Sequence, residues 1–308
     1  MRRRSGKHKP PLFKLFYRHL LWWSGKLIML SLAELPLQFT SFFFSIAFLF
    51  WYYVFRKFRH IAVEQLKEAL KINSKEAEGI TKKMFLHLGR NFAEFLAIAR
   101  NPRRIVLSLV DGEEFKQKIS EALKQKKGVI VVTGHIGNWE LLGAYSAQHF
   151  PTAVIAKKIY FNKYDKEISS RRRKLKMSVI YQEEGIRPLL EALHKNSVVG
   201  ILADQDIKRA AGDFVQFFGK PAYTVTAPST LSLKSGAPLF VAALRRTSLL
   251  KHKIFIVGPI TILPSGDRNT DRINLTQTWT TVLENIIRQE PSQWVWFHKR
   301  WNTRPEEV

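Results

Sequence analysis

The chain has 308 residues, which allows one large domain or two small ones and is enough to bury a substantial core. Its 50 lysine and arginine residues against 25 acidic residues give a net charge of +25, which indicates an anionic partner: a membrane surface, an acidic protein, a phosphorylated substrate or nucleic acid. Cysteine is absent, which excludes disulfides, thiolate metal sites and cysteine nucleophiles.

The first sixty residues predict a membrane anchor behind a basic tail. The apolar segment Leu27–Phe55 carries one charge, Glu34, and the 21 residues of Leu35–Phe55 carry none. A helix of that length spans roughly 30 Å, enough for a bilayer core. The apolar part is too long for a cleaved signal peptide, and Pro36 divides it, so both a spanning and a re-entrant anchor fit, with a buried soluble helix as the alternative. Aromatic residues expected at the membrane interface are Trp22, Trp23, Trp51, Tyr52 and Tyr53.

Beyond residue 60 the sequence first predicts two amphipathic helices, divided near Asn73–Ser74, and then alternating helices and strands. Continuous apolar strands that alternate with helices are typical of a parallel sheet covered on both faces. We therefore predict an α/β fold with a mostly parallel central sheet, in two parts: a tail and anchor over 1–59 and an α/β domain over 60–308. The strands are expected at 128–134, 152–157, 177–182, 197–204, 238–246 and 253–260, and the helices at 113–127, 138–150, 162–175, 186–196, 223–236 and 276–290.

The sequence VVTGHIGNWELLG, residues 131–143, marks the candidate active site. His135 follows a buried strand, and ligands of open α/β sheets bind at the carboxyl ends of strands. Helical positions five residues apart differ by about 140°, so we expect His135 in a loop and Glu140 in the first turn of the next helix, where the carboxylate folds back onto the imidazole. Such a histidine can act as a general base, while Gly134 and Gly137 let backbone N–H groups approach a substrate. The alternative is a helix-capping histidine without a catalytic role.

Two further clusters carry polar candidates. Asp204 ends a buried strand in the sequence ADQD, either at the active-site edge of the sheet or in a solvated turn. Arg171, Arg172 and Arg173 form a solvated helix face or a phosphate site, since arginine forks match phosphate geometry. Phe217 and Phe218 line an apolar groove or pack in the core.

These features together resemble the bacterial late acyltransferases of lipid A biosynthesis, of the lauroyl and myristoyl transferase type. The similarity covers nearly the whole chain in order: the apolar N-terminal segment, GHIGNWE, ADQD, FFGKPAYTVTAPSTLSLKSGAPLF and the ending WVWFHKRWNTRPEEV. The H-x4-[DE] motif alone is shared with glycerolipid acyltransferases, which usually have aspartate where this chain has Glu140. The combination of motifs is much more specific.

The resemblance implies transfer of a fatty acyl chain from acyl carrier protein to the free hydroxyl of an acyl chain on a lipid A precursor. It implies that His135 deprotonates this hydroxyl, that Glu140 orients and charges the imidazole, and that one of Arg171, Arg172 and Arg173 stabilises the tetrahedral intermediate. Asp204 would give polar support, and Asn138 joins the arginines and Asp204 as a candidate for substrate binding. We expect no cofactor, no metal and no nucleic acid, and a location at the bacterial inner membrane with the site on the cytoplasmic side.

Two other functions remain open from the sequence. One is an acyltransferase for another glycolipid or a lysophospholipid, because acceptor choice lies in the shape of the pocket. The other is a non-catalytic protein that binds a membrane surface or nucleic acid, which the charge of +25 also allows.

Overall fold

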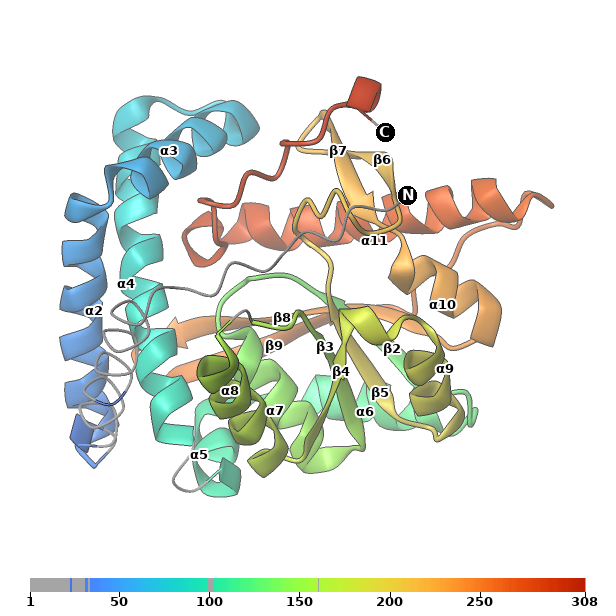
Figure 1. The fold of residues 1–308 in the computed structure, drawn as a ribbon, viewed down its shortest axis with the longest axis horizontal. Helices are drawn as coiled ribbons and strands as arrows, with labels where there is room; N and C mark the ends of the chain where they lie inside the picture. The colour runs from blue at the N-terminus through green and yellow to red at the C-terminus, as the bar shows by residue number, and fades with distance from the viewer. Residues whose placement is uncertain (1–22, 24–30, 33, 99–101, 160, 308) are drawn as a thin grey trace, which may run out of the picture.

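The computed structural model describes residues 23, 31–32, 34–98, 102–159 and 161–307 (Figure 1). The basic tail, Trp22 and the first part of the predicted apolar segment lie outside these residues. The elements in chain order are α2 (Leu37–Val54), α3 (Arg56–Leu70), α4 (Ser74–Ile98), α5 (Pro102–Leu109), β1 (Val110–Asp111), α6 (Glu113–Leu123), β2 (Val129–Thr133), α7 (Trp139–His149), β3 (Thr152–Ala156), α8 (Asn162–Lys174), β4 (Met177–Tyr181), α9 (Arg187–His194), β5 (Val198–Leu202), β6 (Gly212–Phe217), β7 (Lys220–Val225), α10 (Ala227–Ser235), β8 (Leu239–Ser248), β9 (Lys251–Val257) and α11 (Arg268–Gln289), with short 3-10 turns at 182–184, 291–293 and 305–307.

The predicted α/β fold is confirmed. Seven strands form one sheet in the order β1-β9-β8-β2-β5-β3-β4, and every pair is parallel except β8 with β9. Strand β2 lies in the middle of this sheet, and all five of its residues are buried. Helix α11 begins at Arg268 rather than at the predicted residue 276, and two further segments differ from the prediction. Residues 223–225, expected in a helix, belong to β7, which pairs with β6 as a separate antiparallel hairpin, and a short helix, α5, precedes β1.

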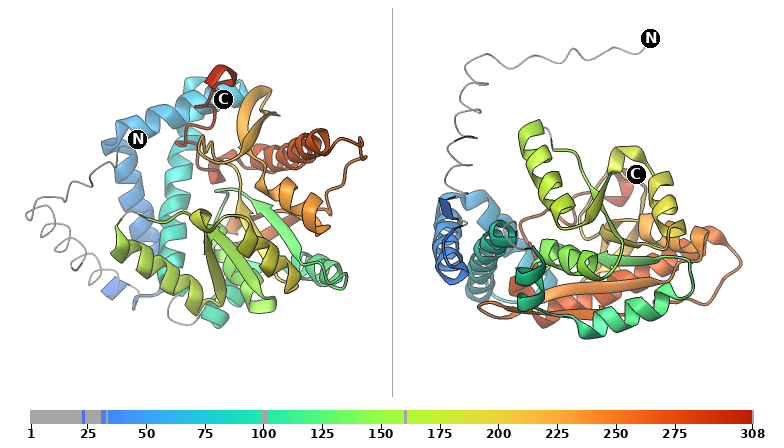
Figure 2. Two further views of the ribbon diagram at one scale, coloured as in Figure 1. Left: turned by 45° about the vertical axis from the view of Figure 1, so that its right-hand side comes forward. Right: turned by 90° about the horizontal axis from the view of Figure 1, so that it is seen from below.

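The sheet separates two cores, as the alternation of side chains along β2 requires. Ile130 and Val132 pack in one cluster with residues of α3, α4, α9, α10 and α11. Val129 and Val131 pack in the other cluster with residues of α5, α6 and α7. Figure 2 shows the sheet with helices packed around it from two further directions.

Helix α2 is the apolar N-terminal helix, and it packs along α4 at one edge of the molecule (Figures 1 and 2). Pro36 caps it, so the predicted break lies at its first turn. It is the one helix of the described residues with the length and composition to cross a membrane, although 28% of that stretch is buried. The division of the chain at residues 59 and 60 falls inside α3 and remains a prediction.

Candidate active site

The loop between β2 and α7 carries His135 at the carboxyl end of the central strand, as predicted. The backbone N–H groups of Gly137 and Asn138 donate to carbonyl oxygens of Gln293 (2.8 Å) and Leu244 (3.3 Å). Gly137 has φ +53°, and a Cβ there would lie 1.7 Å from the carbonyl oxygen of Leu244. Only glycine fits this position, and the two hydrogen bonds tie the backbone of the loop to β8 and to the C-terminal segment.

His135 is held by Asp204, which follows β5 on the neighbouring strand. Its Nδ1 lies 2.8 Å from Asp204 Oδ1, and its backbone N–H donates to Asp204 Oδ2 at 2.7 Å. The indole N–H of Trp294 donates to the same Oδ2 at 2.8 Å. Since the carboxylate can only accept, Nδ1 of the neutral imidazole carries the proton and Nε2 is left as the base.

The charges of the pair stabilise each other. Burial lowers the pKa of His135, but the charge and hydrogen bond of Asp204, with the charge of Glu140, outweigh burial and raise the pKa above its usual 6.5. Burial raises the pKa of Asp204, but its contacts with His135 and Trp294 bring that pKa down to about 2. Asp204 is therefore an anion at every pH at which His135 titrates.

Glu140 does not make the predicted hydrogen bond to His135. It lies in the first turn of α7, as expected, but its carboxylate accepts two hydrogen bonds from the guanidinium of Arg172, at 3.1 and 2.5 Å. A planar guanidinium fork matches both carboxylate oxygens, whereas the imidazole is already bound to Asp204. Burial lowers the pKa of Arg172, but Glu140 outweighs burial and raises it.

The structure separates the three arginines of α8. Arg172 lines the cleft described below, with its side chain 18% exposed. Arg171 Nε donates to Glu167, and its guanidinium lies over the ring of Phe95, 5.6 Å from the centroid. Arg173 is exposed at the end of the helix. Only Arg172 is thus placed beside Glu140 and the cleft.

Asn138 and Asp204 have supporting places in the structure, and their roles in substrate binding remain predictions. Asn138 Oδ1 caps α7 by accepting from the backbone N–H of Leu141 at 3.1 Å, and its Nδ2 donates to Glu94 at 2.7 Å. Asn138 borders the cleft, but these two bonds hold its amide. Asp204 is buried behind His135, and its oxygens accept from His135 and Trp294.

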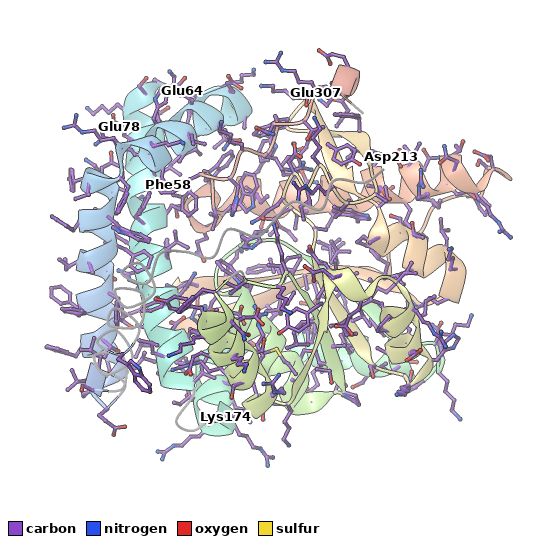
Figure 3. The ribbon with its side chains drawn as sticks, viewed as in Figure 1. Phe58, Glu64, Glu78, Lys174, Asp213 and Glu307 are labelled. Atoms are coloured by element: carbon purple, nitrogen blue, oxygen red, sulfur yellow. The ribbon has the colours of Figure 1, made fainter. Side chains whose placement is uncertain are left out.

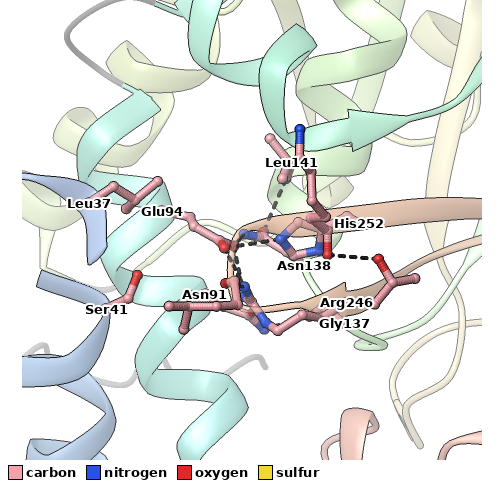
Figure 4. A network of polar contacts seen from close by, with 12 residues as sticks. Leu37, Ser41, Asn91, Glu94, Gly137, Asn138, Leu141, Arg246 and His252 are labelled. Atoms are coloured by element: carbon pink, nitrogen blue, oxygen red, sulfur yellow. Dashed lines mark hydrogen bonds and ion pairs between the residues drawn. The ribbon is translucent and has the colours of Figure 1, made fainter. Parts of the chain in front are cut away.

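A buried ionic network, which was not predicted from the sequence, lies beside the loop (Figure 4). Glu94 of α4 accepts from both terminal nitrogens of Arg246, at 2.5 and 2.9 Å, and its Oε1 lies 3.0 Å from His252 Nε2. Asn91 Nδ2 donates to the carbonyl oxygen of Gly137 at 2.6 Å. Burial raises the pKa of Glu94, but His252 and Arg246 lower it to about 2. The network therefore fixes the loop from below through an ionised, fully buried carboxylate.

Gln205 and His298 also lie at the site, and neither was predicted from the sequence as a site residue. Gln205 Nε2 lies 3.1 and 3.2 Å from the two ring nitrogens of His135 and 2.6 Å from His298 Nε2. Burial and the charge of His135 lower the pKa of His298. A neutral His298 accepts from the Gln205 amide, which keeps that amide beside the imidazole of His135. Their positions within ADQD and WFHKR were the available signal.

His135 opens onto a cleft of about 1300 Å³. Near His135 its wall is polar, with Glu140, Arg172 and Gln205; elsewhere most of its lining is apolar, for example Phe48, Phe92 and Ile168. Phe217 and Phe218 are buried in the core away from this lining. Among the described residues there is no group of three histidine or acidic side chains that could hold a metal ion.

Comparison with known proteins supports the resemblance. The model of the bacterial lipid A biosynthesis acyltransferase family matches residues 9–303. A lipid A biosynthesis palmitoleoyltransferase of Escherichia coli K12 is 26% identical over 189 residues, 61% of this chain and 60% of that protein. A lipid A biosynthesis lauroyltransferase of the same organism is 32% identical over 126 residues, 40% of either chain. A phosphatidylinositol mannoside acyltransferase of Mycolicibacterium smegmatis is 28% identical over 124 residues, 39% of this chain and 40% of that protein.

Proposed function

Since the chain belongs to the bacterial lipid A biosynthesis acyltransferase family, we propose that it transfers a fatty acyl group from acyl carrier protein to a hydroxyl on an acyl chain of a lipid A precursor. The observation that carries this proposal is the His135–Asp204 pair at the mouth of a large, mostly apolar cleft. A neutral histidine held by a carboxylate supplies a base, and an apolar cleft of this size accommodates acyl chains.

In the proposed reaction Nε2 of His135 takes the proton of the acceptor hydroxyl. The hydroxyl oxygen attacks the thioester carbonyl, and the tetrahedral intermediate collapses to an ester as the C–S bond breaks. The proton on Nε2 then passes to the departing thiolate. Asp204 holds the tautomer and stabilises the imidazolium, the role of the aspartate in other His–carboxylate pairs.

Arg172 is the proposed donor to the developing oxyanion. It is the one arginine of Arg171–Arg173 that borders the cleft, and Glu140 holds its guanidinium in place. Glu140 thereby positions Arg172, and its charge also favours the imidazolium of His135. In this proposal acyl transfer depends on Glu140 through Arg172, without a hydrogen bond from Glu140 to His135.

We place the protein at the bacterial inner membrane with the site on the cytoplasmic side, because an acyl carrier protein is a cytoplasmic donor. The acidic carrier, an anionic acceptor and anionic lipids would all favour a chain with a net charge of +25. Helix α2 is the described element suited to contact the bilayer.

The test is an assay of purified protein with acyl-carrier-protein and acyl-CoA donors. The acceptors are a Kdo2-lipid IVA-like precursor, a phosphatidylinositol mannoside and lysophosphatidic acid. We expect transfer to the lipid A precursor, loss of transfer in His135→Ala, and normal transfer in the control His194→Ala, an exposed histidine at the end of α9. Exclusive use of lysophosphatidic acid would contradict the proposal, and vesicle binding without any turnover would favour a binding protein.

A phosphatidylinositol mannoside is the second candidate acceptor. It is favoured by the similarity to the mycobacterial enzyme, whose identity to this chain is close to that of the Escherichia coli relatives. The same acceptor panel distinguishes the two glycolipids directly.

A further inference from the structure

Helix α2 turns small polar side chains inward, together with Phe44 and Tyr52, and most of its large apolar side chains outward. Thr40, Ser41 and Ser45 are buried against the protein, and the hydroxyls of Thr40 and Ser45 donate to carbonyl oxygens of their own helix. In the described residues, 11 of the 19 exposed large hydrophobic side chains lie between Leu35 and Phe58. The outer face of α2 consists of Phe39, Phe42, Phe43, Ile46, Phe50, Tyr53 and Val54.

This distribution of polar and apolar side chains is the reverse of that on a helix exposed to water. A surface helix normally buries its apolar stripe and exposes polar residues. A contiguous exposed apolar patch marks an interaction surface, and a helix with this composition suits a lipid environment. Directly after α2, the exposed side chains of Arg56 and Lys57 can bind anionic headgroups.

The packing of α2 on α4 disfavours an orientation in which α2 crosses the bilayer along the membrane normal. The two helices lie side by side over the length of α2 (Figure 1), and a Cβ on Gly89 would lie 2.3 Å from the carbonyl oxygen of Phe44. If α2 stood upright in a bilayer, α4 would share its depth. The exposed carboxylate of Glu78, which Figure 3 shows on α4 where α2 leads into α3, would then lie at the depth of that end of α2. Charged groups in hydrocarbon are costly, so this orientation is unfavourable.

A path of aromatic rings runs from the cleft to the exposed end of α2, beside the outer face. Phe48 of α2 lines the cleft together with Phe92 of α4, and their ring centroids are 6.0 Å apart. On its other side Phe48 lies 5.3 Å from Trp51, which is 49% exposed, and Trp51 lies 5.1 Å from Phe55. A line of aromatic rings thus leads from the apolar cleft wall to the exposed surface.

We propose that α2 lies in the plane of the membrane surface with its outer face in the lipid, and that it does not span the bilayer. Lipid acceptor and acyl chains then reach His135 sideways, past Phe48, without leaving the apolar phase. The inference rests on the proposed membrane location, but the depth of α2 is measured without turnover and so is tested separately from acyl transfer.

The absence of cysteine makes the test clean, because single cysteines can be introduced into the full chain without a background. Phe39→Cys, Ile46→Cys and Tyr53→Cys lie on one face of α2, seven residues or about 10 Å apart along the helix. Each variant carries a nitroxide label in vesicles of phosphatidylethanolamine and phosphatidylglycerol, and power saturation with oxygen and a nickel chelate gives the depth. Ser265→Cys, in an exposed loop before α11, is the water-exposed control.

An in-plane helix predicts the same shallow depth at all three sites, about 5–10 Å below the headgroup boundary. A label at Ile46 about 10 Å deeper than those at Phe39 and Tyr53 would indicate a spanning helix and overturn the inference. Water exposure at all three sites would also overturn the inference, since the face would then not be in lipid. Burial without lipid contact would overturn it too, since a second copy or another segment of the chain would then cover the face. Acyl transfer by the same variants shows whether the proposed function stands when the orientation does not.

Discussion

Replacing Asp204 by asparagine tests the central pair of the site. Two N–H groups, from the His135 backbone and the Trp294 indole, donate to Oδ2, so the amide oxygen of asparagine must take that position. Its NH₂ group then faces Nδ1 of His135, where the carboxylate oxygen lay at 2.8 Å. Nδ1 must become an acceptor, which moves the proton to Nε2 and removes the base.

We expect Asp204→Asn to lower kcat by roughly 10³- to 10⁴-fold, the size found when an aspartate that fixes a catalytic tautomer is replaced. The residual kcat/KM should also change its pH dependence. Transfer requires neutral His135, so the wild-type rate rises with pH through a pKa above 6.5, and the variant loses the contact that raises this pKa.

The assay is acyl transfer from acyl carrier protein between pH 5 and 9, with Asp213→Asn as the matched control. Asp213 of β6 pairs with Arg272 away from the cleft, so its removal should leave the rate and profile unchanged. An Asp204→Asn enzyme within tenfold of wild type, or with the same pH midpoint, would refute the assignment of Asp204 as the partner of the base.

Three further predictions concern the surroundings of His135. Glu140→Ala and Arg172→Ala should each lower kcat/KM strongly. The fold-loss of the double variant should be much smaller than the product of the two single fold-losses, since either change breaks the same pair. A fold-loss equal to that product would show that the two residues act separately. Gly137→Ala should lower both Tm and activity because its Cβ meets a carbonyl oxygen at 1.7 Å, whereas Gly79→Ala, with no atom within 4 Å in mid-helix, should be neutral or slightly stabilising; equal Tm values would contradict this. Glu94→Gln leaves a buried guanidinium without its counter-charge and should cost about 3–5 kcal/mol of unfolding free energy in urea at pH 7. The pKa of Glu94, about 2, lies below the ordinary 4.5, so the stability that Glu94 contributes is present above pH 4.5 and is lost as pH falls toward 2. The difference in unfolding free energy between the wild type and the variant should therefore become smaller in acid. A difference that stays constant with pH would argue against an ionised Glu94.

The sequence predicted the sheet and the place of His135 well because both depend on local patterns. The continuous apolar sequences of β2, β5 and β8 predict buried strands. Because parallel strands end at the same edge of a sheet, the place of His135 at that edge follows. The predicted membership of the lipid A acyltransferase family is confirmed by the family match over residues 9–303. The β6–β7 hairpin was missed because its polar and aromatic residues, with Pro221, resemble a loop.

The partners of the site residues were harder to predict because they are distant in sequence. Asp204 lies 69 residues from His135, and Glu140 was the nearer carboxylate, so local spacing pointed to the wrong partner. The buried pair of Glu94 and Arg246 joins residues 152 apart, and no local pattern reveals it. Which arginine borders the cleft depends on how α8 is rotated, which a basic run such as 171–174 does not disclose.

The most direct measurement is mass spectrometry of lipid A from cells that carry this protein and from matched cells that lack it. The proposed function predicts one ester-linked acyl chain fewer in the cells that lack the protein, restored by the wild type and by His194→Ala but not by His135→Ala. Identical lipid A in both cells, or restoration by His135→Ala, would contradict a His135-dependent acyl transfer to lipid A.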